Sequence, residues 1–243
     1  MNSASNGDEL FESEIKGLKL LNVSKTIKIP NVIHSSKVGN VSFLLLEYIE
    51  KGIPTNDFWT SFGYQLAAMH KTSNDYFGLD SNNFIGSLPQ QNIPKDNWID
   101  FFICERIQPQ INLAISLSLI ETKTINLFEK LFTKLKDIFP KESPSLIHGD
   151  LWNGNFLADQ ENQPVIFDPS VSYSHREMDL AMSLLFGGFG NQFYQSYNDA
   201  FPLEKGFQSR VEIYQLYYLM VHVNIFGSSY LSSVKNILSR HVE

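Results

Sequence analysis

Two short segments of this 243-residue sequence carry side chains that suit phosphoryl transfer. The first is His-Gly-Asp-Leu-Trp-Asn-Gly-Asn at 148–155, and the second is Ile-Phe-Asp-Pro at 166–169. Asp150 can accept the proton of an attacking hydroxyl, while Asn155 and Asp168 offer the hard oxygen ligands that Mg²⁺ prefers beside nucleotide phosphates. These residue types at these spacings predict a site for metal-assisted phosphoryl transfer.

The spacing of these residues allows their side chains to meet. Asp150 precedes Asn155 on one Gly-rich loop, so a turn can bring both to one metal–nucleotide complex. Asp168 follows the apolar run Val165–Phe167, and a strand there would hold the carboxylate at a fixed point. Pro169 stiffens the exit from that strand. Each of these residues alone could belong to an ordinary turn, where Asp and Asn are common. Their combination favours a phosphoryl-transfer site.

Composition and charge limit the partners of this chain. The formal net charge of −7 argues against sequence-independent binding of nucleic acid, which needs a basic surface. The single cysteine, Cys104, cannot form an internal disulfide and is expected to be a small apolar residue of a helix. The N-terminus has no signal-peptide pattern, and no apolar run is long enough to span a membrane. We therefore expect a soluble cytoplasmic protein whose oligomeric state stays open.

Hydrophobic periodicity and breaker residues predict the elements that must position these side chains. The first helix begins near Glu9, and a later one begins at Asn56 or Asp57 and ends near Lys71. The segment 74–97 is rich in breakers and is expected to be irregular. The order of elements favours an α+β fold over alternating βαβ units. The other predicted strands are 31–36, 41–49, 146–148, 155–157 and 164–167, and the other predicted helices are 96–119 with a kink at Pro109, 122–139, 177–186, 191–201 and 206–241.

The sequence resembles the aminoglycoside-phosphotransferase-like kinases, and more closely the fructosamine (ketosamine) kinase family. The similarity runs in the right order from about Phe11 to Tyr218. Its motifs are the two segments above together with His175-Arg176-Glu177-Met178-Asp179-Leu180-Ala181, Phe186-Gly187-Gly188-Phe189, Tyr76-Phe77-Gly78-Leu79, Asn83-Phe84-Ile85-Gly86, Gln91-Asn92 and Trp98.

This resemblance implies an α+β, protein-kinase-like fold of the aminoglycoside-phosphotransferase type. Residues 1–52 would be a remnant of the N-terminal nucleotide-binding lobe, with the hinge at 47–50, and residues 53–243 would form the helical C-terminal lobe. The implied activity is ATP- and Mg²⁺-dependent phosphorylation of a sugar hydroxyl on a ketosamine. The substrate would be a small-molecule fructosamine or ribulosamine, or such an adduct on a glycated lysine.

The resemblance also implies roles for the residues of the two segments and of the hinge. Asp150 would be the catalytic base, and Asn155 and Asp168 would be the metal ligands. Glu47 and Ile49, at the end of the second predicted strand, would offer backbone groups to adenine. A plain strand end is the alternative interpretation of those two residues.

Five further residues have a functional and a structural interpretation. Glu14 would be the helix glutamate that pairs with a phosphate-binding lysine, or else a solvated acid on a helix face. Asp179 would brace the catalytic loop through backbone donors, or else favour the start of a helix. Trp152 and His175 would be walls of the sugar pocket, although Trp152 could equally be core. His148 is expected to orient the loop rather than to transfer protons.

The start of the sequence departs from the family pattern. Family members have a Gly-rich hairpin and a strand lysine before the helix that contains Glu14. Here no Gly-x-Gly run precedes Glu9, and the first lysine is Lys16. We therefore expect weak or no kinase activity from residues 1–243. A start codon assigned downstream of the true one and a disrupted gene explain this better than a degenerate binding protein, because Asp150, Asn155 and Asp168 are all present.

Three rival functions remain from the sequence. One is a kinase of the same fold that acts on an aminoglycoside- or choline-like hydroxyl. Another is a non-catalytic nucleotide- or sugar-binding protein, which the absent lysine suggests. A protein kinase is disfavoured, because the stretch from Asp168 to Glu177 is too short for an activation loop and no Ala-Pro-Glu segment follows.

Overall fold

Helix α1 (Gly7–Val23) is the first element of residues 7–242, the part of the chain that this computed structural model describes. Acidic residues occupy its first turn, where the helix dipole favours negative charge. Leu18 and Leu21, which share one face of the helix, are buried in the core. The predicted helix in this region is therefore confirmed.

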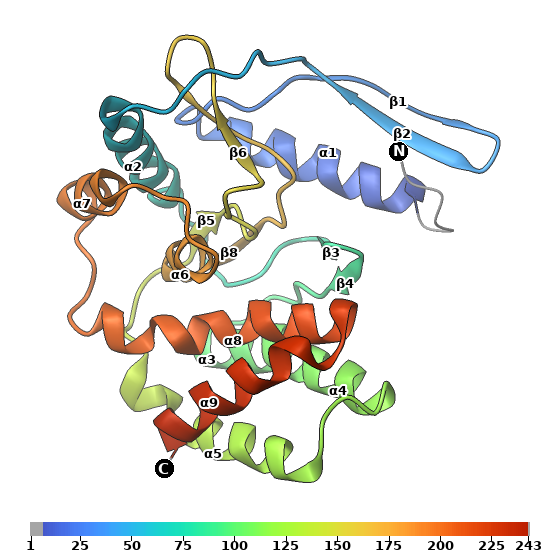
Figure 1. Cartoon of the computed structure of the whole chain (residues 1–243), viewed down its shortest axis with the longest axis vertical. Helices are drawn as coiled ribbons and strands as arrows, with labels where there is room; N and C mark the ends of the chain where they lie inside the picture. Colours follow the sequence, from blue (N-terminus) through green and yellow to red (C-terminus); the bar gives the residue numbers. More distant parts are fainter. Residues whose placement is uncertain (1–6, 243) are drawn as a thin grey trace.

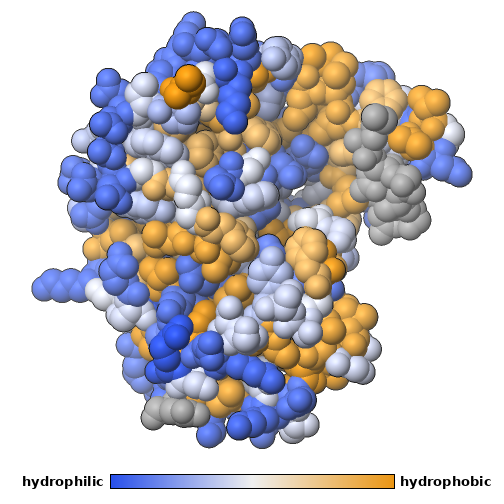
Figure 2. Space-filling model, viewed as in Figure 1, coloured by the Kyte–Doolittle hydropathy of each residue, from blue (hydrophilic) through white to orange (hydrophobic). Residues whose placement is uncertain are grey.

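A two-stranded antiparallel hairpin, β1 (Val32–Val38) and β2 (Val41–Leu46), runs along α1 (Figure 1). The prediction of a buried strand over 41–49 is wrong in two respects. The strand ends at Leu46, and most of its residues are exposed or half-buried, with Leu45 50% exposed. Among the described elements, α1 is the one that covers this hairpin. The face of the hairpin that points away from α1 therefore meets solvent. Figure 2 shows apolar surface over it.

The larger part of the molecule is helical. Among residues 7–242 no helix combines the length and apolar character that crossing a membrane requires. Helices α2 and α7 pack closely, because Gly63 of α2 lies against the backbone of α7, where a Cβ would collide with Phe193 and Ser196. The helices are α2 (Asn56–His70), α3 (Trp98–Phe101), α4 (Gln108–Ser116), α5 (Thr122–Ile138), α6 (Glu177–Leu185), α7 (Asn191–Ala200), α8 (Phe207–Phe226) and α9 (Leu231–Val242).

Two predicted helices are interrupted. The predicted helix 96–119 contains a π-helical segment, Phe102–Ile107, which ends two residues before Pro109, where a kink was expected. Cys104 lies in this segment and is exposed rather than packed in the core. The predicted helix 206–241 breaks at Gly227, whose φ of 84° a residue with a side chain rarely adopts. A short 3-10 turn, Ser228–Tyr230, then leads into α9.

Three short antiparallel strand pairs frame the loops that carry the predicted catalytic residues. One of them lies inside the segment 74–97, which was expected to be irregular, and its second strand contains a proline, which sequence patterns place at an edge. Strand β8 was also not predicted. The pairs are β3 (Asn83–Ile85) with β4 (Leu88–Gln90), β5 (Ser145–Ile147) with β8 (Ser172–Ser174), and β6 (Phe156–Ala158) with β7 (Pro164–Ile166).

This arrangement of helices and small sheets is an α+β fold, as the order of elements predicted. Figure 1 shows α1, the β1–β2 hairpin and β6 in one part of the molecule and α8, α9, α4 and α5 in the other, with β5, β8, β3 and β4 between them. The loops that follow β5 and β7 lie between these two parts. The division of the chain at residues 52 and 53 into two lobes stays a prediction.

Candidate active site

The loop after β5 is anchored by Asp179, a fully buried residue in the first turn of α6. Its carboxylate accepts the backbone N–H of His148 at 2.7 Å and that of Gly149 at 2.8 Å. A third partner is His70 of α2, whose Nε2 lies 3.1 Å from the same carboxylate. These are the backbone contacts expected of a residue that braces the catalytic loop.

His148 connects the two catalytic segments. It is fully buried, and its Nε2–H donates to the carbonyl of Phe167 at 3.0 Å, directly before Asp168. Its Nδ1 accepts the backbone N–H of Asp150 at 3.3 Å. Burial lowers the pKa of His148, so the ring is neutral near pH 7 and fixes the loop rather than exchanging protons.

Asn155 forms hydrogen bonds with both Asp150 and Asp168. Its Nδ2 donates to Oδ2 of Asp150 at 3.1 Å, to the carbonyl of Asp150 at 2.9 Å and to the carbonyl of Asp168 at 3.3 Å. These bonds leave the Oδ1 atom of Asn155 as the group that can bind a metal ion. One carboxamide therefore links the loop after β5 with the segment after β7.

Asp168 has a backbone φ of 56°, in the left-handed region that Asp and Asn enter more readily than other residues with side chains. Its side chain is exposed, in contrast to the buried strand β7 before it. The next residue but one, Ser170, donates from its hydroxyl to the carbonyl of Phe84 at 2.6 Å. The β3–β4 hairpin thus fastens the segment that presents Asp168.

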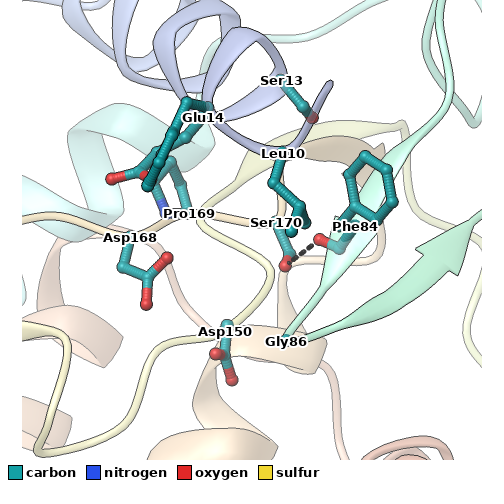
Figure 3. Close-up of a pocket in the computed structure, with 10 residues that line it drawn as sticks. Leu10, Ser13, Glu14, Phe84, Gly86, Asp150, Asp168, Pro169 and Ser170 are labelled. Atoms are coloured by element: carbon teal, nitrogen blue, oxygen red, sulfur yellow. Dashed lines mark hydrogen bonds between the residues drawn. The ribbon is translucent and has the colours of Figure 1, made fainter. Parts of the chain in front are cut away.

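Two adjoining cavities contain the predicted catalytic groups. Asp150 and Asp168 line a small cavity beneath α1, and Glu14 of α1 lines the same cavity from above (Figure 3). Asp150 and Asp168 also line a larger cavity of about 490 Å³, together with Asn155 and Trp152. The structure therefore brings the three oxygen-bearing residues named from the sequence to a common space, and adds Glu14 at its edge.

The charges in this space repel one another. Burial, and next the negative charge of Asp168, raise the pKa of Asp150 to about 7. The same two causes, in the same order, raise the pKa of Glu14 to about 7. None of these carboxylates forms a salt bridge with another residue of the range 7–242. A cation bound between them would relieve this repulsion.

The donor set fits Mg²⁺ held jointly by protein and phosphate. Within residues 7–242 no three His, Cys, Asp or Glu side chains are grouped so that they alone could hold a metal ion. Asp168 and the Oδ1 atom of Asn155 supply two oxygen donors, and Mg²⁺ in kinase sites commonly takes its remaining ligands from nucleotide phosphates and water. Such an ion is expected to bind together with a nucleotide.

We expect the metal- and nucleotide-free protein to lose stability as the pH rises from about 5 to about 8. The pKa values of Asp150 and Glu14 rise from 3.8 and 4.5 to about 7 on folding, so the folded state binds more protons than the unfolded state between these values. The loss should be on the order of 2–4 kcal/mol. Urea unfolding in EDTA at several pH values measures this loss of unfolding free energy. The loss should be smaller in Asp150→Asn. An unfolding free energy that does not change with pH would contradict the prediction.

The predicted hinge residues lie away from these cavities. Glu47 and Ile49 follow β2 and line a separate surface recess together with Lys28 and Asp159. The backbone N–H of Glu47 donates to the carbonyl of Asn31 at 2.8 Å. Within residues 7–242 no hydrogen bond uses the Glu47 carbonyl or the Ile49 N–H, so both groups remain available to a ligand.

The two predicted walls of the sugar pocket have different positions. Trp152 lines the larger cavity beside Asp150. His175 does not reach a cavity, because it is fully buried and stacks on Trp98 with ring centroids 4.5 Å apart, while its Nδ1 bonds the hydroxyl of Tyr214 at 3.0 Å. The prediction that His175 faces the sugar is therefore wrong, and the residue belongs to the aromatic core.

Several residues at this site were missed by sequence analysis. His70, the buried partner of Asp179, lies 109 positions away in the chain and carries no local signal. An aromatic wall of the larger cavity also went unpredicted, because its rings come from separate elements. Its members are Phe186 at the end of α6, His222 and Phe226 on α8, and Tyr230 in the turn before α9.

The fold and the site define a class of protein. An ADP-bound aminoglycoside phosphotransferase superposes with a TM-score of 0.63 at 16% identity, covering 96% of this chain and 82% of that one. At this level of identity the likeness concerns the fold. The chain therefore has the aminoglycoside-phosphotransferase and protein-kinase-like fold.

Within this class the chain belongs to the fructosamine kinase family, whose model matches residues 1–243. A protein assigned as a ketoamine kinase in Enterococcus faecium is 40% identical over 230 residues, covering 94% of this chain and 81% of the relative. The ketosamine-3-kinase of Mus musculus is 32% identical over 266 residues, covering 98% and 85%. A structure assigned as a fructosamine-3-kinase of Thermobifida fusca has a TM-score of 0.86 at 33% identity, covering 98% and 81%. These similarities make the chain a fructosamine kinase-like enzyme, a sugar phosphotransferase.

Proposed function

We propose that this enzyme transfers the γ-phosphoryl group of ATP, in the presence of Mg²⁺, to a sugar hydroxyl of a fructosamine- or ribulosamine-type ketosamine. The observation that carries the proposal is the shared cavity of Asp150, Asn155 and Asp168. Asp150 and Asn155 belong to the loop after β5, and Asp168 belongs to the segment after β7. The carboxamide of Asn155 donates hydrogen bonds to both aspartates. Phosphoryl transfer depends on such positioning and on stabilisation of charge.

Each residue of the site has a distinct part in this proposal. The Asp150 carboxylate accepts the proton of the sugar hydroxyl, and its pKa of about 7 suits a general base at neutral pH. Asp168 and the Oδ1 atom of Asn155 hold Mg²⁺, which neutralises charge on the phosphates when bound. Asp179 and His148 act through the loop backbone, and they keep Asp150 in place.

The remaining contacts concern adenine and the sugar. The free backbone carbonyl of Glu47 and the N–H of Ile49 are proposed to bind adenine, as the edge of a base needs one acceptor and one donor. Trp152 offers a flat apolar face to the C–H surface of the sugar. The acceptor is a small-molecule ketosamine or a glycated lysine.

A panel of acceptors tests the proposed substrate class. The purified chain is mixed with ATP, Mg²⁺ and, separately, a fructosamine, a ribulosamine, an aminoglycoside and choline, and ADP release is measured. We expect slow release with the two ketosamines, above the acceptor-free background but weak, as the sequence predicts for residues 1–243. Release with the aminoglycoside or choline alone would assign the site to another hydroxyl acceptor.

Glu14 is proposed to weaken the binding of Mg²⁺–ATP, because no salt bridge joins it to a cation among residues 7–242. In the chain 1–243 we expect Glu14→Gln to tighten binding of Mg²⁺–ATP by about three- to tenfold at pH 8, since it removes a negative charge near the phosphates. The pKa of about 7 means that this gain shrinks at pH 6. Calorimetry at both pH values measures it, and weaker binding by the variant would show that Glu14 instead holds a cation.

A further inference from the structure

One wall of the larger cavity is a continuous row of aromatic rings. Trp152 lies 6.4 Å from Phe186, measured between ring centroids, and Phe186 lies 5.0 Å from His222. His222 in turn lies 5.5 Å from Phe226 and 4.9 Å from Tyr230. The row therefore leads from the neighbour of the catalytic base outward to the end of α8, which Figure 1 shows beside the β3–β4 hairpin.

The outer rings of this row are exposed although they are apolar. Phe226 is 64% exposed and Phe186 is 39% exposed, while His222 and Tyr230 are half-buried. Exposed rings grouped at the mouth of a cavity are typical of a binding surface. The two carboxylates among the residues that line this cavity are Asp150 and Asp168, and neither belongs to the aromatic row.

His222 adds one directed polar group to the row. Its Nδ1 lies 2.7 Å from the backbone carbonyl of Tyr218, and a carbonyl can only accept, so the proton resides on Nδ1. In the neutral ring Nε2 is then a hydrogen-bond acceptor. Within residues 7–242 no hydrogen bond engages this Nε2, which leaves it for a ligand that donates.

We infer that the aromatic row Phe186–His222–Phe226–Tyr230 binds the amine portion of the ketosamine and selects for its charge. This inference rests on the proposed function and specifies its substrate. With the sugar over Trp152, the secondary ammonium lies against the rings, whose π faces attract a cation. One ammonium N–H is donated to Nε2 of His222, and an apolar substituent on the amine covers the exposed ring of Phe226.

Such a wall distinguishes ketosamines from two other classes of ligand. A plain ketose has a hydroxyl where the ketosamine has its ammonium, so it gains no cation–π attraction. An aminoglycoside carries several ammonium groups, for which this part of the wall offers no carboxylates. The row therefore favours one cationic nitrogen with an apolar substituent.

Calorimetric titration of the full chain tests this inference with a matched pair of ligands. One ligand is the fructosamine of benzylamine, and the other is the 1-O-benzyl ether of fructose. The two share the sugar and the benzyl ring, and the ether has an oxygen where the fructosamine has its ammonium. We expect the amine to bind at least about tenfold more tightly at pH 7.5. His222→Phe keeps an aromatic ring and removes the acceptor, so it should reduce this preference by about two- to threefold, while the attraction of the π faces for the ammonium remains.

Two further variants test whether an effect on affinity is specific to the aromatic row or follows from removing any exposed ring. Phe226→Ala should weaken both ligands by about three- to tenfold, because it removes the contact with the benzyl group. Tyr64→Ala, at an exposed tyrosine of α2, should leave both affinities unchanged. Circular dichroism verifies that each variant is folded.

The outcomes that contradict the inference are distinct from failure of the proposed function. Equal affinity of the wild-type chain for the amine and the ether would overturn the role of the row and leave the sugar site intact. This comparison decides the question even if His222→Phe does not fold. Failure to bind either ligand or free fructose would remove both the inference and the proposed acceptor site.

Discussion

Replacing Asp150 by asparagine is expected to lower kcat for ketosamine phosphorylation by about 10²- to 10⁴-fold. The asparagine keeps the size of the side chain and its proximity to Asn155, but it cannot accept the proton of the sugar hydroxyl. Nucleotide binding should change little, because the proposed metal ligands stay in place. Initial rates of ADP release with saturating ATP and a ketosamine measure the effect.

The cause of this loss can be separated from a loss of folding. Asp150→Asn removes a carboxylate whose pKa is raised by burial and by Asp168, so the variant should be at least as stable as the wild type at pH 8. Asp137→Asn, at an exposed position of α5, is the matched control and should retain full activity. A decrease of less than about tenfold in kcat would mean that another group accepts the proton.

Replacing Asp168 by asparagine is expected to abolish metal-dependent nucleotide binding, with a loss of at least about 100-fold in kcat/KM. The carboxylate is the charged member of the proposed ligand pair, and a neutral amide binds Mg²⁺ much more weakly. Mn²⁺ can replace Mg²⁺ as a spectroscopic probe. Electron paramagnetic resonance with Mn²⁺ and ADP then reports the fraction of metal bound to the protein.

Position 168 suits this test because the substitution leaves the backbone undisturbed. Asparagine tolerates the φ of 56°, and the side chain is exposed, so the substitution should not lower the thermal transition; the loss of repulsion with Asp150 and Glu14 should raise it at pH 8. Asn155 is a poorer choice, since it is buried and bonds to both loops. Unaltered binding of Mn²⁺–ADP by Asp168→Asn would exclude Asp168 as a metal ligand.

Local sequence patterns predicted which three oxygen-bearing residues share a cavity, because these residues lie close together in the chain. The loop 148–155 and the segment 166–169 each follow a short apolar run, and both runs form strands. The α+β class, which followed from the order of elements, and the family, which followed from the motifs, are both confirmed. The positions of helix ends were also close, since caps and prolines act locally.

Long-range contacts were not predictable in the same way. His70 meets Asp179 only because α2 and α6 lie near each other, and nothing around residue 70 marks that pairing. The aromatic row has a similar origin, since Phe186 and Tyr230 belong to separate elements. Sequence patterns locate a ring on an element but do not say which cavity it lines.

Two predictions, for His175 and for the strand 41–49, were wrong for a common reason. Each depended on which neighbouring elements the side chains face. His175 lies in a family motif next to the site, yet the turn between β8 and α6 directs it inward onto Trp98. The apolar run of β2 suggested burial on both faces, whereas α1 covers one side of the hairpin. Burial depends on the neighbours of an element as well as on its own residues.

The central claim, that Asp150, Asn155 and Asp168 act on one metal–nucleotide complex to phosphorylate a ketosamine, is tested most directly by a single turnover. Enzyme in excess is mixed with γ-labelled ATP, Mg²⁺ and a fructosamine, and the labelled product is identified. The account predicts one labelled phosphate on the sugar, whose formation EDTA prevents and Asp150→Asn slows by about 10²- to 10⁴-fold. Binding of both ligands without any transfer of label, even at stoichiometric enzyme, would contradict it and indicate a non-catalytic binding protein.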